Sequence, residues 1–135
     1  MLKRIRLLTL VTLTFMAITA HAAAMLDFLD NDYNSDLSND QMQKLIKQAG
    51  AQRGWKIDTI NETMLLATII VRNKHTVAVN IELEGDNYDV TYNSSENMRY
   101  NENKKTIHRK YNGWVRNLVR DIDMAIQNYE ILQAS

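Results

Sequence analysis

Residues 55–92 constrain the fold most, because strand-forming segments follow one another there with only short turns between them. Side chains in 55–59, 75–83 and 88–92 alternate between apolar and polar, as expected of strands with one buried face. Residues 63–72 are almost entirely apolar and rich in Ile, Leu, Val and Thr, which favours a central strand. Connections this short leave no room for a crossover helix, so successive strands must run antiparallel.

A helical pattern lies on each side of these strands. Residues 38–41 have the form of a capping box, in which the Ser38 hydroxyl and the Gln41 side chain each bind a backbone N–H. Apolar residues then recur at helical spacing up to Gly54, a residue that tolerates the left-handed backbone that ends many helices. A second apolar stripe predicts a long closing helix over residues 107–129.

The order of these elements predicts a two-layer α+β sandwich (α-β-β-β-β-α). A four-stranded antiparallel meander carries one N-terminal and one C-terminal helix on one face. We expect a single domain over residues 38–132, because no linker, repeat or low-complexity block divides it. Gly113 predicts a close approach of the closing helix to the sheet. Residues 23–37 contain several aspartates and lack sustained periodicity, which predicts a mobile acidic leader.

Residues 1–22 have the three parts of a secretory signal peptide. Three basic residues precede an apolar run over residues 7–20, and the small-residue site Ala20-His21-Ala22 follows. The run is shorter than the roughly 20 apolar residues of a membrane span. We therefore expect export to the periplasm, cleavage after Ala22 or, in a second register, after Ala24, and no stable membrane anchor afterwards.

The charge of the mature chain limits the classes of partner that we expect for it. Removal of the predicted signal leaves 13 basic residues against 16 acidic residues, so the mature chain is mildly acidic. Nucleic acids and anionic lipids attract clustered positive charge, so we expect no nucleic acid partner. The chain has no cysteine. We therefore expect neither a disulfide nor a lipid anchor.

Residues suited to catalysis are few. The mature chain holds two histidines, His75 and His108, which is too few for a typical zinc or copper site. His75 has the position of a polar residue at a strand edge, and His108 stands near the start of the closing helix. Glu82 and Glu84 share one side of a strand, but that side faces away from the apolar stripe, so we expect solvated carboxylates.

Residues 30–37 place oxygen-bearing side chains at alternate positions, as in a calcium-binding loop. Ser35 stands where such a loop has glycine, and Gln41 replaces its terminal glutamate. The four glycines of the chain fit no phosphate-binding fingerprint. We therefore expect no catalytic residue, no cofactor and no metal site, and calcium binding by the leader stays an open alternative.

The central strand is apolar on both of its faces. Met64, Leu66 and Ile70 lie on the face opposite to Leu65 and its alternating neighbours. Two helices on one side of the sheet cover only one face. The other face must then meet the leader, the 93–105 loop, a second copy of the chain or another partner, because large exposed apolar patches are uncommon on monomers.

The C-terminal part of the chain carries further candidates. Residues 95–100 read Ser-Glu-Asn-Met-Arg-Tyr, and residues 107–114 read Ile-His-Arg-Lys-Tyr-Asn-Gly-Trp. Together with Arg53-Gly54-Trp55, these motifs resemble a family of small uncharacterised bacterial periplasmic proteins and lipoproteins. The resemblance covers most of the mature chain and implies an exported α+β domain, without an activity to carry over. The absence of an anchoring cysteine separates this chain from the lipoprotein members.

If these motifs form one unit, His108, Tyr111, Asn112 and Tyr100 cluster where the loop enters the closing helix. Such a cluster is either a ligand-binding corner or a structural one, in which amides bind loop backbone and rings fill the core. We expect a non-enzymatic periplasmic protein that binds another protein or an envelope component through the apolar sheet face or this aromatic corner. Self-association through that face would make a homodimer. The alternative is a small-molecule binder or hydrolase with a pocket between the sheet and the last helix.

Overall fold

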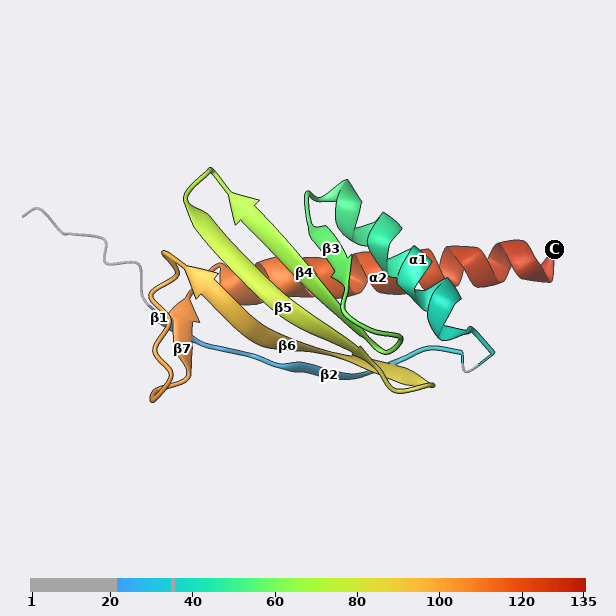
Figure 1. Ribbon diagram of the computed structural model, residues 1–135, viewed down its shortest axis with the longest axis horizontal. Coiled ribbons are helices and arrows are strands. Elements are labelled where there is room, and N and C mark those ends of the chain that lie inside the picture. Colours follow the sequence, from blue (N-terminus) through green and yellow to red (C-terminus); the bar gives the residue numbers. More distant parts are fainter. Residues whose placement is uncertain (1–21, 35) are drawn as a thin grey trace, which may run out of the picture.

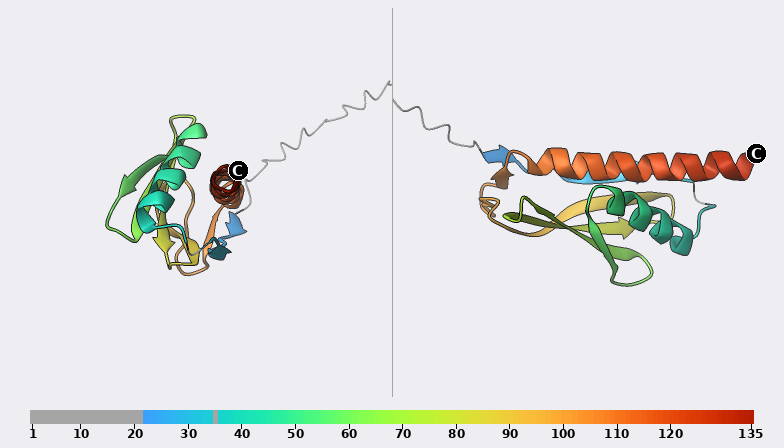
Figure 2. Two further views of the ribbon diagram at one scale, coloured as in Figure 1. Left: turned by 90° about the vertical axis from the view of Figure 1, so that its right-hand side faces the viewer. Right: turned by 90° about the horizontal axis from the view of Figure 1, so that it is seen from above.

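The computed structural model describes residues 22–34 and 36–135, which form an α+β structure of two layers (Figure 1). Both helices lie on one face of the larger sheet (Figure 2). The predicted signal peptide lies outside the described residues except for Ala22. In chain order the elements are β1 (Ala22–Ala24), β2 (Phe28–Asp32), α1 (Asn39–Gln52), β3 (Lys56–Thr59), β4 (Met64–Val71), β5 (His75–Leu83), β6 (Asn87–Glu96), β7 (Thr106–His108) and α2 (Tyr111–Ala134).

The prediction of a four-stranded meander is wrong. The described part of the chain has seven strands in two sheets, one five-stranded and antiparallel in the order β2-β6-β5-β4-β3, the other formed by β1 and β7. The four predicted strands correspond to β3 to β6. β2 comes from the segment expected to be a leader, and it pairs with β6 so that Phe28 lies opposite Val90. This pairing satisfies the N–H and C=O groups that the edge of β6 would otherwise expose.

Side chains also tie the N-terminal segment to the rest of the domain. Asn112 Nδ2 donates a hydrogen bond to the Ala24 carbonyl oxygen at 2.8 Å, and Asn112 Oδ1 accepts one from the Leu26 N–H at 3.0 Å. At an irregularity in β2, Asp30 has a φ of 57° and its N–H donates to Asp89 Oδ1 at 2.8 Å. The segment therefore follows β6 and the start of α2.

Helix α1 begins and ends at the residues that the sequence predicts. Ser38 Oγ accepts a hydrogen bond from the Gln41 N–H at 3.2 Å, and Gln41 Oε1 accepts one from the Ser38 N–H at 2.9 Å. The helix ends at Gln52, and Gly54 follows with a φ of 88°, the left-handed backbone that glycine adopts readily.

Helix α2 differs from the prediction in two respects. It begins at Tyr111, later than predicted, because Thr106–His108 pair with β1 instead. Gly113 has open space around it, so the prediction of a close approach there is wrong. The close approach of a helix to the sheet lies at Gly50 of α1, where an added Cβ would come within 2.3 Å of the Ile57 side chain.

The core fills the space between the two helices and the sheet. Within it, the Tyr88 hydroxyl donates a hydrogen bond to Asp123 Oδ1 at 2.6 Å and so links β6 to α2. Burial is the main cause that raises the pKa of both side chains, and for Tyr88 the hydrogen bond to Asp123 raises it further. No helix in the described ranges combines the length and the apolar character needed to cross a membrane.

Candidate binding sites

The second face of β4 carries a narrow apolar column. Met64 and Leu66 are half-buried, and Ile70 is 61% exposed. Their cross-strand neighbours on β5 are all polar: Glu82, Asn80 and Thr76, respectively. The apolar surface on this face is therefore narrow, which gives a protein partner little area to bury.

The residues of the proposed aromatic corner have separate roles. Tyr100 stacks on Tyr92 with ring centroids 4.2 Å apart, and the buried Tyr111 meets the same ring edge-on at 6.0 Å. Asn112 holds the backbone of the N-terminal segment, as described above. Of the four predicted residues, His108 lines a cavity. The four residues therefore have three different roles. Tyr100 and Tyr111 belong to an aromatic cluster, Asn112 binds the backbone of the N-terminal segment, and His108 lines a cavity.

The cavity at His108 is a basic pocket of about 180 Å³ at the N-terminal end of α2, where β5 begins. The His75 and His108 ring centroids lie 5.3 Å apart, and the His108 ring lies nearly parallel to Trp114 at 6.5 Å. Within the described part of the chain, none of the three long basic side chains in the lining forms an ion pair. The pocket includes Arg72, His75, His108, Arg109, Lys110 and Trp114 in its lining.

Hydrogen bonds fix the tautomers of the two histidines. His75 Nδ1 lies 2.9 Å from the Asn97 carbonyl oxygen, so in the neutral ring the proton is on Nδ1. His108 Nδ1 accepts a hydrogen bond from the Lys110 N–H at 3.2 Å, which places its proton on Nε2. Burial lowers the pKa of His108, and His75 and the basic side chains around it lower it further.

The two loops beside this pocket contain residues with left-handed backbone. Arg72 and Asn73 have φ of 55° and 53° in the turn between β4 and β5, and Asn97 and Arg99 have φ of 56° and 51° in the loop after β6. Arginine adopts this conformation uncommonly. Such conformations persist where the surrounding structure imposes them, and they gather at binding and catalytic sites.

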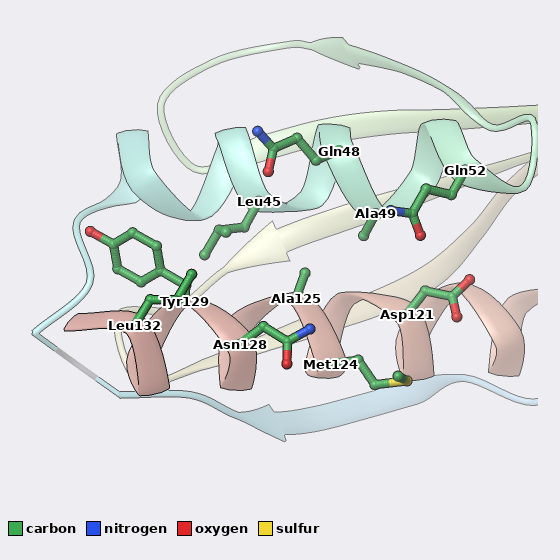
Figure 3. Close-up of a pocket in the computed structure, with 10 residues that line it drawn as sticks. All are labelled: Leu45, Gln48, Ala49, Gln52, Asp121, Met124, Ala125, Asn128, Tyr129 and Leu132. Atoms are coloured by element: carbon green, nitrogen blue, oxygen red, sulfur yellow. The ribbon is translucent and has the colours of Figure 1, made fainter. Parts of the chain in front are cut away.

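A groove of about 320 Å³ runs between α1 and the C-terminal half of α2 (Figure 3). Leu45 and Ala49 of α1 and Ala125 of α2 contribute apolar surface, and the short alanine side chains on both helices leave space between them. Met124 and Leu132 also line the groove and are 53% and 71% exposed.

Polar contacts join the two helices toward both ends of this groove. Near the start of α1, Gln41 Nε2 donates a hydrogen bond to the Tyr129 hydroxyl oxygen at 3.0 Å. Just after α1, Arg53 forms an ion pair with Asp121. These contacts fix the separation of the helices, so the groove is already formed in the free protein.

The structure also brings three carboxylates together at the end of β5. Oxygen atoms of Glu82, Glu84 and Asp89 lie within 4.8 Å of one another, and both glutamates are exposed. Exposed acidic groups often gather without an ion, so we assign no metal to them. Among the described residues, residues 30–37 contribute no comparable group of carboxylates or histidines.

No protein-family model, curated protein or solved structure matches this chain. The resemblance to bacterial periplasmic proteins and lipoproteins therefore stays a prediction.

Of the residues that line the pocket, the sequence singled out His108 alone as a candidate for binding, and it did not predict the groove. His75 was expected at a strand edge and Trp114 within the closing helix, and neither was joined to His108. A signal was present, because Arg72 stands just before His75 and two basic residues follow His108. For the groove, the signal was an apolar stripe that continues along α2 past the residues that pack on the sheet.

Proposed function

We propose that the protein is exported to the periplasm, where it acts as a non-enzymatic protein that binds another protein through the groove between α1 and α2. The observation that carries this proposal is a preformed groove of mixed apolar and polar lining, bordered by Met124 and Leu132, both more than half exposed. Large apolar side chains that stay in water beside a hollow are typical of a surface that a partner covers.

The chemistry of the groove favours an amphipathic helix as the bound element. The packing of an apolar helix face into a hydrophobic groove is a common mode of protein recognition. Gln48, Gln52 and Asn128 line the groove and are exposed, so they offer uncharged hydrogen-bonding groups at its rim. A partner helix with apolar residues flanked by polar, uncharged residues fits both features.

The histidine geometry supports a binding role rather than nucleophilic catalysis. His75 bonds the Asn97 carbonyl oxygen and His108 bonds the Lys110 N–H. Within the described part of the chain, neither imidazole bonds a hydroxyl or a carboxylate. A Ser or Thr nucleophile depends on such a bond to a base, which a third group orients.

Site-specific photocrosslinking in living cells tests the proposal. A photoreactive residue at position 124 or 132 should crosslink the exported protein to one defined protein. The same residue at position 60, an exposed apolar position outside the groove, should not. Crosslinks to a second copy of the chain would make the groove a homodimer interface. Equal crosslinking at all three positions, or at none, would contradict the proposal.

A variant that fills the groove provides a second test. Ala125→Phe places a ring in the space between the helices and should abolish the crosslink from position 132. Ala125→Ser, which keeps the small size, should preserve it. Cell fractionation of the tagged protein checks the location, since recovery from the cytoplasm with residues 1–22 still attached would contradict export.

A further inference from the structure

The basic pocket at the N-terminal end of α2 has an apolar neighbour. A second hollow of about 300 Å³ is lined by Trp55, Ile69, Arg53 and Asn117, and Val71 and Trp114 line both hollows. The second hollow is larger than the roughly 150 Å³ that holds a benzene ring inside a protein. A basic pocket and a partly apolar one therefore share a wall.

The long charged side chains that line the first hollow are all basic. Arg72 comes from the turn before β5, and Arg109 and Lys110 come from the connection between β7 and α2. Burial lowers the pKa of His108 most, and the nearby Arg99, Arg109 and Lys110 cations lower it further. A pocket lined by cations without a carboxylate partner lacks the counter-charge that a bound anion supplies.

We infer that these two hollows together bind a small organic anion, with its carboxylate or phosphate group among Arg72, Arg109 and Lys110 and its apolar group against Val71 and Trp114. Guanidinium groups bind carboxylate and phosphate oxygens through two parallel hydrogen bonds. His108 adds a donor at Nε2, because its Nδ1 is already occupied by the Lys110 N–H. The site is separate from the groove, which lies at the other end of α2.

The surroundings of His108 favour its neutral form. A proton added to His108 would have to occupy Nδ1, which accepts the Lys110 N–H, so it would break that hydrogen bond. Burial and the surrounding basic side chains also lower the pKa of His108. The neutral ring keeps its Nε2–H available as a donor to the bound anion.

NMR titration of the full mature protein tests the site, using phenylacetate, phenyl phosphate, inorganic phosphate and neutral 2-phenylethanol as probes. Both phenyl anions should shift the signals of His75, His108 and the Trp114 indole. They should bind at least about tenfold more tightly than 2-phenylethanol, which lacks the charge-assisted hydrogen bonds. Inorganic phosphate should bind more weakly than phenyl phosphate, because it leaves the apolar hollow empty.

Charge variants with a matched control locate the binding. The double variant Arg72→Gln/Arg109→Gln should weaken phenylacetate binding about tenfold or more. Lys47→Gln/Arg120→Gln removes the same charge from exposed positions outside the lining and should change affinity less than about twofold. Equal losses in the two double variants would overturn the proposal, because the binding would then follow net charge alone.

A histidine variant tests the donor at Nε2. His108→Asn keeps an acceptor for the Lys110 N–H but lacks Nε2, and it should weaken phenylacetate binding. Unchanged affinity in His108→Asn would overturn the role given to His108.

Two further results would overturn the site itself. The first is the absence of shifts at His75, His108 and Trp114 with any phenyl anion at millimolar concentration. The second is binding to phosphatidylglycerol vesicles, but not to phosphatidylcholine vesicles, without binding of the small acids. That result would mark a lipid surface instead of a pocket for a small anion.

Discussion

The two ends of α2 present surfaces of opposite chemistry. At the N-terminal end, His108 and Trp114 line a pocket surrounded by basic side chains. At the C-terminal end, Met124 and Leu132 line a groove whose surface is partly apolar and whose polar side chains are mostly uncharged. The buried residues between them, such as Leu118, pack against the sheet. A single amphipathic helix can thus carry two separate sites, because a packed middle segment keeps them apart.

The two sites also differ in how the chain builds them. The groove needs only two helices and the contacts that join them, Gln41 to Tyr129 and Arg53 to Asp121. The pocket needs the turn before β5, the loop after β6 and the start of α2 to meet at one place, and both loops contain left-handed residues. We therefore expect pocket shape to depend on loop conformation and groove shape on helix separation.

The largest effect should come from the segment that both sites share. Leu118→Ala removes a fully buried side chain in the middle of α2 and should lower the free energy of unfolding by about 2–5 kcal/mol. Leu132→Ala changes a side chain that is mostly exposed and should stay within about 0.5 kcal/mol of the parent protein. Urea denaturation followed by circular dichroism measures both, and equal losses would mean that the end of α2 is packed as tightly as its middle.

A matched pair of asparagines compares the two ends of the helix directly. Asn112→Ala removes two hydrogen bonds to the backbone of the N-terminal segment and should lower stability by about 2 kcal/mol. Asn128→Ala, in the groove, should have little effect on stability, because the described structure gives its side chain no hydrogen bond. Amide hydrogen exchange at residues 22–32 should quicken in the first variant alone. Unchanged exchange there would show that strand pairing is sufficient to hold the segment.

A smaller effect is expected for the contact near the start of α1. Tyr129→Phe removes the hydrogen-bond acceptor of Gln41 and should lower stability by about 1 kcal/mol or less. It should also weaken partner binding in the groove, because the helix separation is then less fixed. Tyr100→Phe is the control, since the described structure shows no hydrogen bond to its hydroxyl. Chemical denaturation and the crosslinking yield from position 132 measure the two readouts.

The smallest expected effect concerns Asp123 and depends on pH. Burial raises the pKa of this carboxyl group, so the folded state favours the protonated form more than the unfolded state does. The raised pKa of Asp123 contributes to the free energy of unfolding at pH values below the pKa that Asp123 has in the unfolded state. This contribution is lost as the pH rises through the pKa that Asp123 has in the folded state. Asp123→Asn should therefore melt slightly higher than the parent protein at neutral pH, with a difference that vanishes in acid. Thermal melts across this range would contradict the argument if the variant melted lower at neutral pH.

Local signals in the sequence predicted most of the individual elements. The capping box from Ser38 to Gln41 and the glycine at position 54 predicted the ends of α1, because caps depend on a few neighbouring residues. Alternation of apolar and polar side chains predicted β5, whose buried residues face the helices. Such alternation arises because one side of the strand is buried. It can therefore be recognised in the sequence without knowing which elements cover that side.

Structural features that depend on pairing with a segment distant in the sequence were not predicted. β1 is three alanines, which form a strand only because Thr106–His108 lie beside them. β2 has no alternation because its pairing with β6 is interrupted near Asp30. For the same reason the sequence could not join His75 to His108, since their contact depends on where two loops and a helix end come together.

The pairing of the first described strands with the last third of the chain sets the order in which this protein can fold. Phe28 pairs with Val90, and Ala24 is held by Asn112, so the N-terminal segment has no native neighbour until most of the chain is available. Contacts between distant residues also slow folding, because a large loop must close before they form. A nascent chain with this topology stays without its full tertiary structure during synthesis, which is compatible with the export proposed above.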